Sequence, residues 1–186
     1  TIYRDSHDKK MNEQTGEIGK GFSVDVAQKW EDAFNQFEEL SVRRIALRST
    51  IVLAADGEYI QINKKLAELR LAGKQGDGMQ HISWIHIEDF CRAIDFMIDN
   101  KNFSGPVNLA APQAIRNKVF SKLLRKQMGV RLGLPAPAFL VKIGAIFMRT
   151  ESELVLKSRY VEAQKLNDAG FQFNYQTMDQ ALADLL

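Results

Sequence analysis

The sequence has 186 residues, of which 45% are hydrophobic and 26% charged, as in ordinary globular domains. Its formal net charge is +2, with 25 basic and 23 acidic side chains intermixed, so it lacks the basic stripe that nucleic-acid binding requires. No apolar run approaches the roughly 20 residues that span a bilayer, so we expect no membrane segment. The single cysteine, Cys91, cannot form an intrachain disulfide, which favours a cytoplasmic location.

The first part of the chain predicts a loop followed by a helix. Residues 1–21 are polar and rich in glycine, which is typical of a surface loop. Apolar side chains then recur at helical spacing and predict an amphipathic helix over about 23–40, with Trp30 on its buried face and Glu31 outside.

A β-type run, RRIALRSTIVL, follows at residues 43–53 and is apolar along much of its length. Such a run suits a strand covered on both faces, as in a parallel sheet. Periodicity then predicts a helix over about 59–69, a turn-rich loop at 73–78 and a short strand over 80–86.

The next helix, running to about Asn100, carries Cys91 on a face that we expect to be buried. Glu88 and Asp89 fit its first turn, where acidic side chains favour the helix dipole. The other members of that face share 3–4 spacing with Cys91 and are Ile87, Phe90, Ile94, Met97 and Ile98.

The remaining chain predicts a short strand at 107–110 and then mostly helix. One helix carries apolar residues from Val119 to Met128, and Pro137 stands where another can begin. Thr150-x-x-Glu153 and Thr177-x-x-Gln180 both fit the capping-box pattern that opens a helix. The alternation of helices and short strands indicates an α/β fold, with too few strands for a complete doubly wound sheet.

Four segments together resemble a known family. They are GFSVDVAQKWE (21–31), ALRSTIVLAADG (46–57), SWIHIEDF (83–90) and GPVNLAAPQAIRN (105–117). In this order they resemble the C-terminal half of atypical extended short-chain dehydrogenases, an NAD(P)-dependent epimerase-like family that ends in a small domain of unknown function. The resemblance implies the C-terminal portion of a Rossmann-type fold with a small mixed substrate subdomain and a helical C-terminus. Residues 1–130 would form the C-terminal part of the epimerase/dehydratase-like fold, and residues 131–186 a small helical domain of unknown function.

The resemblance also implies a function and a missing element. Family members are NAD- or NADP-dependent oxidoreductases or epimerases acting on small molecules such as nucleotide sugars, and the chain would supply the substrate side. No G-x-G-x-x-G turn follows a strand here, and Gly76-Asp77-Gly78 precedes one. We therefore expect the chain to be inactive alone and to pair with itself or with an N-terminal half. The alternative is a non-catalytic binding or regulatory module.

The acid–base pair of the family is a Tyr-x-x-x-Lys in which the lysine lowers the tyrosine pKa. Alignment on the trailing Trp-Glu places this pair on Phe22 and Val26, which can exchange no proton. Tyr3 resembles the tyrosine that follows the serine-bearing strand and is the remaining candidate for a catalytic proton donor. It can equally be a wall of the pocket or a packing residue.

Two further groups of site residues follow from the resemblance. The strand end beside the nicotinamide ribose corresponds to Arg48, Ser49, Thr50 and Ile51. The strand that lines the sugar-nucleotide pocket corresponds to Gln80, Ser83, Trp84 and His86. The first group is alternatively an ordinary buried strand, and Trp84 either stacks on a ring or belongs to the core.

We expect no metal site, because the chain has only three histidines. His81 and His86 are five residues apart on a predicted strand, where alternation directs their side chains to opposite faces.

Overall fold

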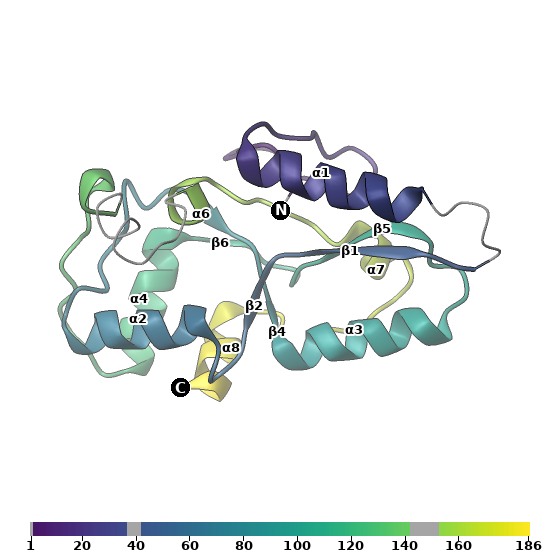
Figure 1. The fold of residues 1–186 in the computed structure, drawn as a ribbon. Helices are drawn as coiled ribbons and strands as arrows, with labels where there is room; N and C mark the ends of the chain where they lie inside the picture. The colour runs from purple at the N-terminus through teal and green to yellow at the C-terminus, as the bar shows by residue number, and fades with distance from the viewer. Residues whose placement is uncertain (1, 37–41, 142–152) are drawn as a thin grey trace.

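The computed structural model describes residues 2–36, 42–141 and 153–186. Helices and strands alternate along the chain, which confirms the α/β class (Figure 1). In chain order they are α1 (Phe22–Asn35), β1 (Ile45–Ser49), β2 (Ile51–Leu53), α2 (Glu58–Glu68), β3 (His81–Ile82), β4 (Trp84–His86), α3 (Ile87–Asp99), β5 (Gly105–Leu109), β6 (Ile115–Arg116), α4 (Asn117–Gln127), α6 (Glu153–Leu156), α7 (Gln164–Asp168) and α8 (Met178–Leu185).

The predicted run at 43–53 forms two strands that change partner at Thr50. β1 pairs in parallel with β5, and β2 pairs in parallel with β4, so one continuous segment joins the two strand pairs (Figure 1). Both the backbone N–H and the Oγ1 of Thr50 donate to the carbonyl of Leu109, at 3.1 and 2.7 Å. These two bonds hold the end of β1 against the end of β5.

The predicted strand at 80–86 is likewise divided, because Ser83 separates β3 from β4. β3 pairs antiparallel with β6, while β4 stays in the parallel arrangement with β2. The combination of parallel and antiparallel pairs is the mixed character expected from the resemblance.

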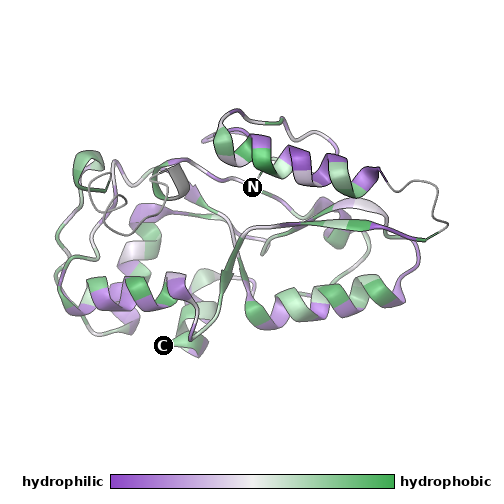
Figure 2. Cartoon of the chain, viewed as in Figure 1, coloured by the Kyte–Doolittle hydropathy of each residue, from purple (hydrophilic) through white to green (hydrophobic). Residues whose placement is uncertain are grey.

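Two apolar clusters hold the fold together. The first joins α3 and β5 to the segment 161–173, and the second joins α2 and α4 to α8. Figure 2 shows hydrophobic colour on the central strands that lie between these helices. The C-terminal segment contributes to both clusters, and α8 opens with the capping box predicted at Thr177 and Gln180. Thr150 of the other predicted capping box lies outside the described residues.

The buried face of α1 differs from the prediction. Trp30 is 73% exposed, whereas Val24 is buried. Glu31, expected outside, is directed inward and binds Arg48 of β1. The apolar spacing predicted the helix correctly but could not show that its inward face carries an ion pair.

The buried face of α3 also differs, because Cys91 is exposed and not a buried thiol. Asp89, Ala93 and Met97 are fully buried, and Phe90, Ile94 and Phe96 pack against the first apolar cluster as partly buried side chains, so the predicted Phe90, Ile94 and Met97 do lie on the inner side of the helix. Each residue turns a helix by about 100°, so a shift of the inward face by one or two positions moves Cys91 to the surface. Asp89 occupies the interior because the C-terminal segment provides hydrogen-bond donors for its carboxylate.

None of the helices in the described ranges combines the length and the hydropathy that a bilayer-spanning segment requires.

Candidate functional site

The carboxyl ends of the parallel strands β1 and β5 lie next to each other, because Ser49 is in register with Leu109. In open α/β sheets, ligands bind just beyond such strand ends. Ser49 is half-buried, and its hydroxyl donates to the carbonyl of Thr50 at 2.8 Å. The residues 48–51, predicted to contact a cofactor, lie at and just beyond the carboxyl end of β1.

A network of hydrogen bonds joins Tyr3 to three structural elements. The Tyr3 phenol donates to Asn108 Oδ1 of β5 at 3.0 Å and accepts from Arg48 Nη1 of β1 at 2.9 Å. The same guanidinium makes two bonds of 2.7 Å to the Glu31 carboxylate of α1. This bidentate, partly buried pair fixes Arg48 and, through it, the position of the Tyr3 hydroxyl.

The electrostatics keep Tyr3 neutral. Burial raises the pKa of the Tyr3 phenol above its usual 10, although the hydrogen bonds from Arg48 and to Asn108 act in the opposite direction. The hydrogen bonds from Arg48 to Glu31 raise the pKa of the guanidinium. At neutral pH the phenol is thus a hydrogen-bond donor and not a phenolate base.

Gln80 and Ser83 are buried and hold neighbouring chain segments. The Gln80 amide donates to the carbonyls of Gln75 and Val155 at 3.0 and 3.1 Å, while its buried Oε1 has no hydrogen-bond partner among the described residues. The Ser83 hydroxyl accepts from the Val161 N–H at 2.8 Å. These side chains therefore connect the strand region to the C-terminal segment.

Trp84 and His86 are buried as well. Trp84 lies in the second apolar cluster, and its indole N–H donates to the carbonyl of Gln113 at 2.8 Å, which is the core placement that the sequence left open. The His86 ring stacks on Tyr175, with centroids 3.6 Å apart, and its Nδ1 accepts from the Glu88 N–H at 3.2 Å. His86 Nε2 is 3.2 Å from Asp184 Oδ2 but is not aligned for a hydrogen bond.

Phe22, at the position where the family dyad would place its tyrosine, begins α1 and is 75% exposed. Val26, at the lysine position, is half-buried. Neither side chain can exchange a proton or carry charge, so the structure brings no acid–base pair together there.

Sequence reasoning missed Glu31 and Asn108. Glu31 is seven positions after the buried Val24, so both lie on one face of the helix. We expected Glu31 on the solvent side because its side chain is acidic. Asn108 lies between Val107 and Leu109 in a buried strand, and a buried amide normally has a hydrogen-bond partner. That signal was present in the sequence.

A family model, described as a domain of unknown function (DUF1731), matches residues 136–185. An epimerase family protein of Staphylococcus haemolyticus is 38% identical over 165 residues, covering 89% of this chain and 54% of that protein. An epimerase family protein of Staphylococcus aureus (strain NCTC 8325 / PS 47) is 36% identical over the same shares. The chain thus spans about half the length of the curated relatives it matches.

Solved structures show the same relationship. The human epimerase family protein SDR39U1 (isoform 2), determined with NADPH, is similar with a TM-score of 0.89 and 25% identity, over 99% of this chain and 61% of that one. A nucleoside-diphosphate sugar epimerase from Corynebacterium glutamicum is similar with a TM-score of 0.77 and 25% identity, over 98% of this chain and 34% of that one.

Proposed function

Since the chain is similar to epimerase family proteins over about half their length, we propose that it is the C-terminal half of an epimerase-like extended short-chain dehydrogenase and forms the substrate side of an NAD(P)-dependent oxidoreductase or epimerase acting on a nucleotide-sugar-like small molecule. The likeness to SDR39U1, which was solved with NADPH, supports NADP or NAD as the cofactor of the whole protein. We expect the chain by itself to have little or no activity.

The observation that carries this proposal is the meeting of β1 and β5 at their carboxyl ends, with the Tyr3 hydroxyl fixed by Arg48 of β1 and Asn108 of β5. In the proposal, residues 48–51 lie beside the nicotinamide ribose, and the Tyr3 hydroxyl gives up its hydrogen bond to Asn108 and donates a proton or hydrogen bond to the reacting oxygen. A neutral phenol held by a cation suits a donor, because the positive charge stabilises the anion left after transfer. Once bound, the cofactor would supply or accept the hydride.

The buried strand residues take a supporting part in this proposal. Gln80, Ser83, Trp84 and His86 are all engaged with the chain itself, so they would shape the floor of the substrate pocket and hold its outer wall. Substitution at these positions would displace the wall of the pocket and so weaken substrate binding.

The test uses the intact protein, titrated with NADPH and NADH by calorimetry and then assayed for hydride transfer by nicotinamide absorbance. Tyr3→Phe removes the phenolic proton and keeps the ring. We expect dinucleotide affinity within about twofold of wild type and a rate reduced by about a hundredfold, the usual worth of a positioned acid. Tyr160→Phe is the matched control, since it removes the hydroxyl of a tyrosine that stacks on His81. Equal rates for Tyr3→Phe and the control would rule Tyr3 out as the donor.

A non-catalytic binding or regulatory module is the second candidate. It is favoured by the exposed Phe22 at the usual tyrosine position and by the raised pKa of Tyr3, because both reduce the capacity for proton transfer. Dinucleotide binding without turnover for any nucleotide sugar would support this alternative.

We also propose a cytoplasmic location and association with the cofactor-binding half of the fold or with a second copy. The reason for the association is the apolar surface that the described chain leaves exposed, including Phe22, Trp30 and Leu47. The reason for the location is the single cysteine, which suits a reducing compartment.

A further inference from the structure

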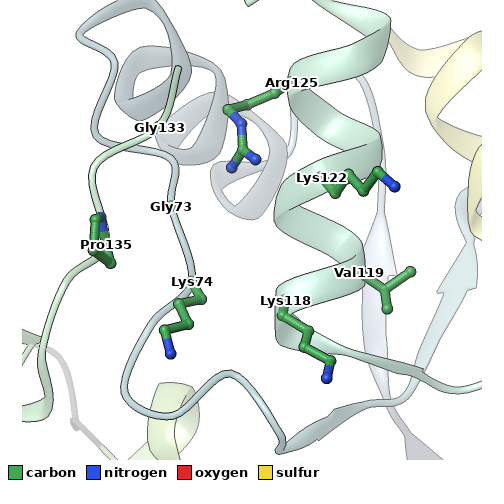
Figure 3. A pocket seen from close by; sticks show the side chains of 8 residues that line it. All are labelled: Gly73, Lys74, Lys118, Val119, Lys122, Arg125, Gly133 and Pro135. Carbon is green, nitrogen blue, oxygen red and sulfur yellow. The ribbon is translucent and has the colours of Figure 1, made fainter. Parts of the chain in front are cut away.

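Apart from the Tyr3 network, the structure contains a basic hollow between α4 and two extended segments. It has a volume of about 490 Å³ and is open to solvent (Figure 3). Four of its lining side chains are cationic, and it shares no residue with the site proposed above. The basic hollow is lined by Gly73, Lys74, Lys118, Val119, Lys122, Arg125, Gly133 and Pro135.

The cations of the basic hollow face no acidic residue in its lining. Within the described parts of the chain, Lys74, Lys118 and Lys122 make no ion pair. Lys126, on the same helix but outside the hollow, lies 3.5 Å from Asp179. Like charges along one lining repel one another, so an anion bound in the hollow relieves that repulsion.

The walls of the basic hollow are held in place by hydrogen bonds. The Gly73 N–H donates to the Leu134 carbonyl at 3.1 Å, and the Ala136 N–H donates to the Lys74 carbonyl at 3.0 Å. The Ser121 hydroxyl of α4 donates to the Gly73 carbonyl at 3.0 Å and so ties this wall to the helix. The hollow is therefore formed before a ligand arrives, which reduces the entropic cost of binding.

Gly78 brings two of the lysines together. A Cβ at Gly78 would lie 2.9 Å from the Cβ of Lys74 and 3.0 Å from the Cβ of Lys118, so both stems pack against this glycine. Its φ of 73° is a conformation that other residues rarely adopt. Arg125 comes from the same helix as Lys118, and its Nη1 donates to the Ala72 carbonyl, which fixes the guanidinium at the wall with further N–H groups available.

We propose that the basic hollow binds a compact, multiply charged anion, namely the phosphate groups of a phosphorylated small molecule. Its volume suits a small ligand and not a long polymer. Val119 and Pro135 give it apolar surface against which the carbon part of such a ligand can pack. The proposal does not depend on redox activity, so it can fail or succeed independently of the proposed function.

Inorganic pyrophosphate is the probe, titrated by calorimetry into the intact protein at low salt. Lys118→Gln/Lys122→Gln should weaken binding by roughly tenfold, because two charge-assisted contacts are lost. Both lysines are exposed, so the variant should keep its fold, which circular dichroism checks. Lys126→Gln removes one charge from the same helix and should change affinity by less than about twofold. Amide shifts of Gly73 and Val119 on titration, measured by NMR, should locate the site.

Four results would overturn the proposal. Wild-type protein that does not bind pyrophosphate, or a double variant that binds it as well as wild type, would exclude an anion site in the hollow. Equal weakening by Lys126→Gln would show a diffuse charge effect. Displacement of pyrophosphate by NADPH, with the same shifts at Gly73 and Val119, would assign the hollow to the cofactor's own phosphates and not to a separate ligand.

Discussion

His81 and His86 are both buried but lie in different surroundings. Both belong to the strand region in which we expected their side chains to point to opposite faces. The His81 ring stacks on Tyr160 with centroids 4.0 Å apart, and the Ser158 hydroxyl lies 3.5 Å from its Nδ1. Burial lowers the pKa of His81 below its usual 6.5, with smaller contributions from Arg116 and His7. His81 is therefore neutral in the folded protein near pH 7.

We predict that His81 makes stability fall in mild acid. Its folded-state pKa is depressed, so below about pH 6.5 the unfolded chain takes up a proton that the folded chain resists. The free energy of unfolding should decrease as the pH falls from about 7 to about 5, and His81→Gln should flatten that decrease. Urea unfolding across this range measures it. His7→Gln should flatten the decrease much less, because the half-exposed His7 makes only a small contribution to the lowered pKa of His81. Identical pH profiles for wild type and His81→Gln would contradict the assignment.

At the scale of elements, Asp89 links α3 to the C-terminal segment. Its side chain is fully buried, and its two oxygens accept from the backbone N–H groups of Asn174 and Tyr175 at 2.9 and 2.8 Å. Arg92 Nη1 also binds it, at 2.7 Å. The sequence predicts Asp89 in the first turn of the helix, which is correct. Its hydrogen bonds to the C-terminal segment could not be predicted, because that segment is more than 80 residues away in the sequence.

Asp89→Asn should release the C-terminal segment. An amide presents one acceptor oxygen in place of two and no charge for Arg92, so we expect a loss of about 2–3 kcal/mol in the free energy of unfolding. Hydrogen exchange of residues 174–186 should accelerate more than exchange in β5. Asp95→Asn on the exposed side of α3 is the control, and it should change neither quantity. Unchanged exchange in the C-terminal segment would show that Asp89 does not hold it.

At the scale of the whole molecule, the described chain leaves apolar side chains on the surface of α1 and β1. Leu47 is 42% exposed in a strand whose sequence suits cover on both faces. Phe22 and Trp30 are more exposed still, on the helix that lies above β1 in Figure 1. Surfaces of this kind mark interaction sites, and the curated relatives are about twice as long as the part matched.

We predict that the isolated 186-residue chain self-associates through this surface. Trp30→Lys should weaken association by at least roughly tenfold, since a central aromatic side chain often dominates an interface. Sedimentation velocity over a concentration series measures the effect. The control is Leu69→Lys, because Leu69 is an exposed leucine at the C-terminal end of α2 and lies outside α1 and β1. A monomer at every concentration would contradict the prediction.

The α/β class, the order of most helices and strands, the capping box of α8 and the relation to epimerase-like proteins could all be predicted from the amino-acid sequence. These features depend on local periodicity and on ordered motifs, which are written along the chain. Tertiary structure decided that Glu31 faces inward, that Cys91 faces outward and that the 43–53 run changes partner at Thr50. It also created the Tyr3 network and the basic hollow. Each of these depends on side chains far apart in sequence, and local spacing carries no information about which distant donor, charge or strand will meet a given residue.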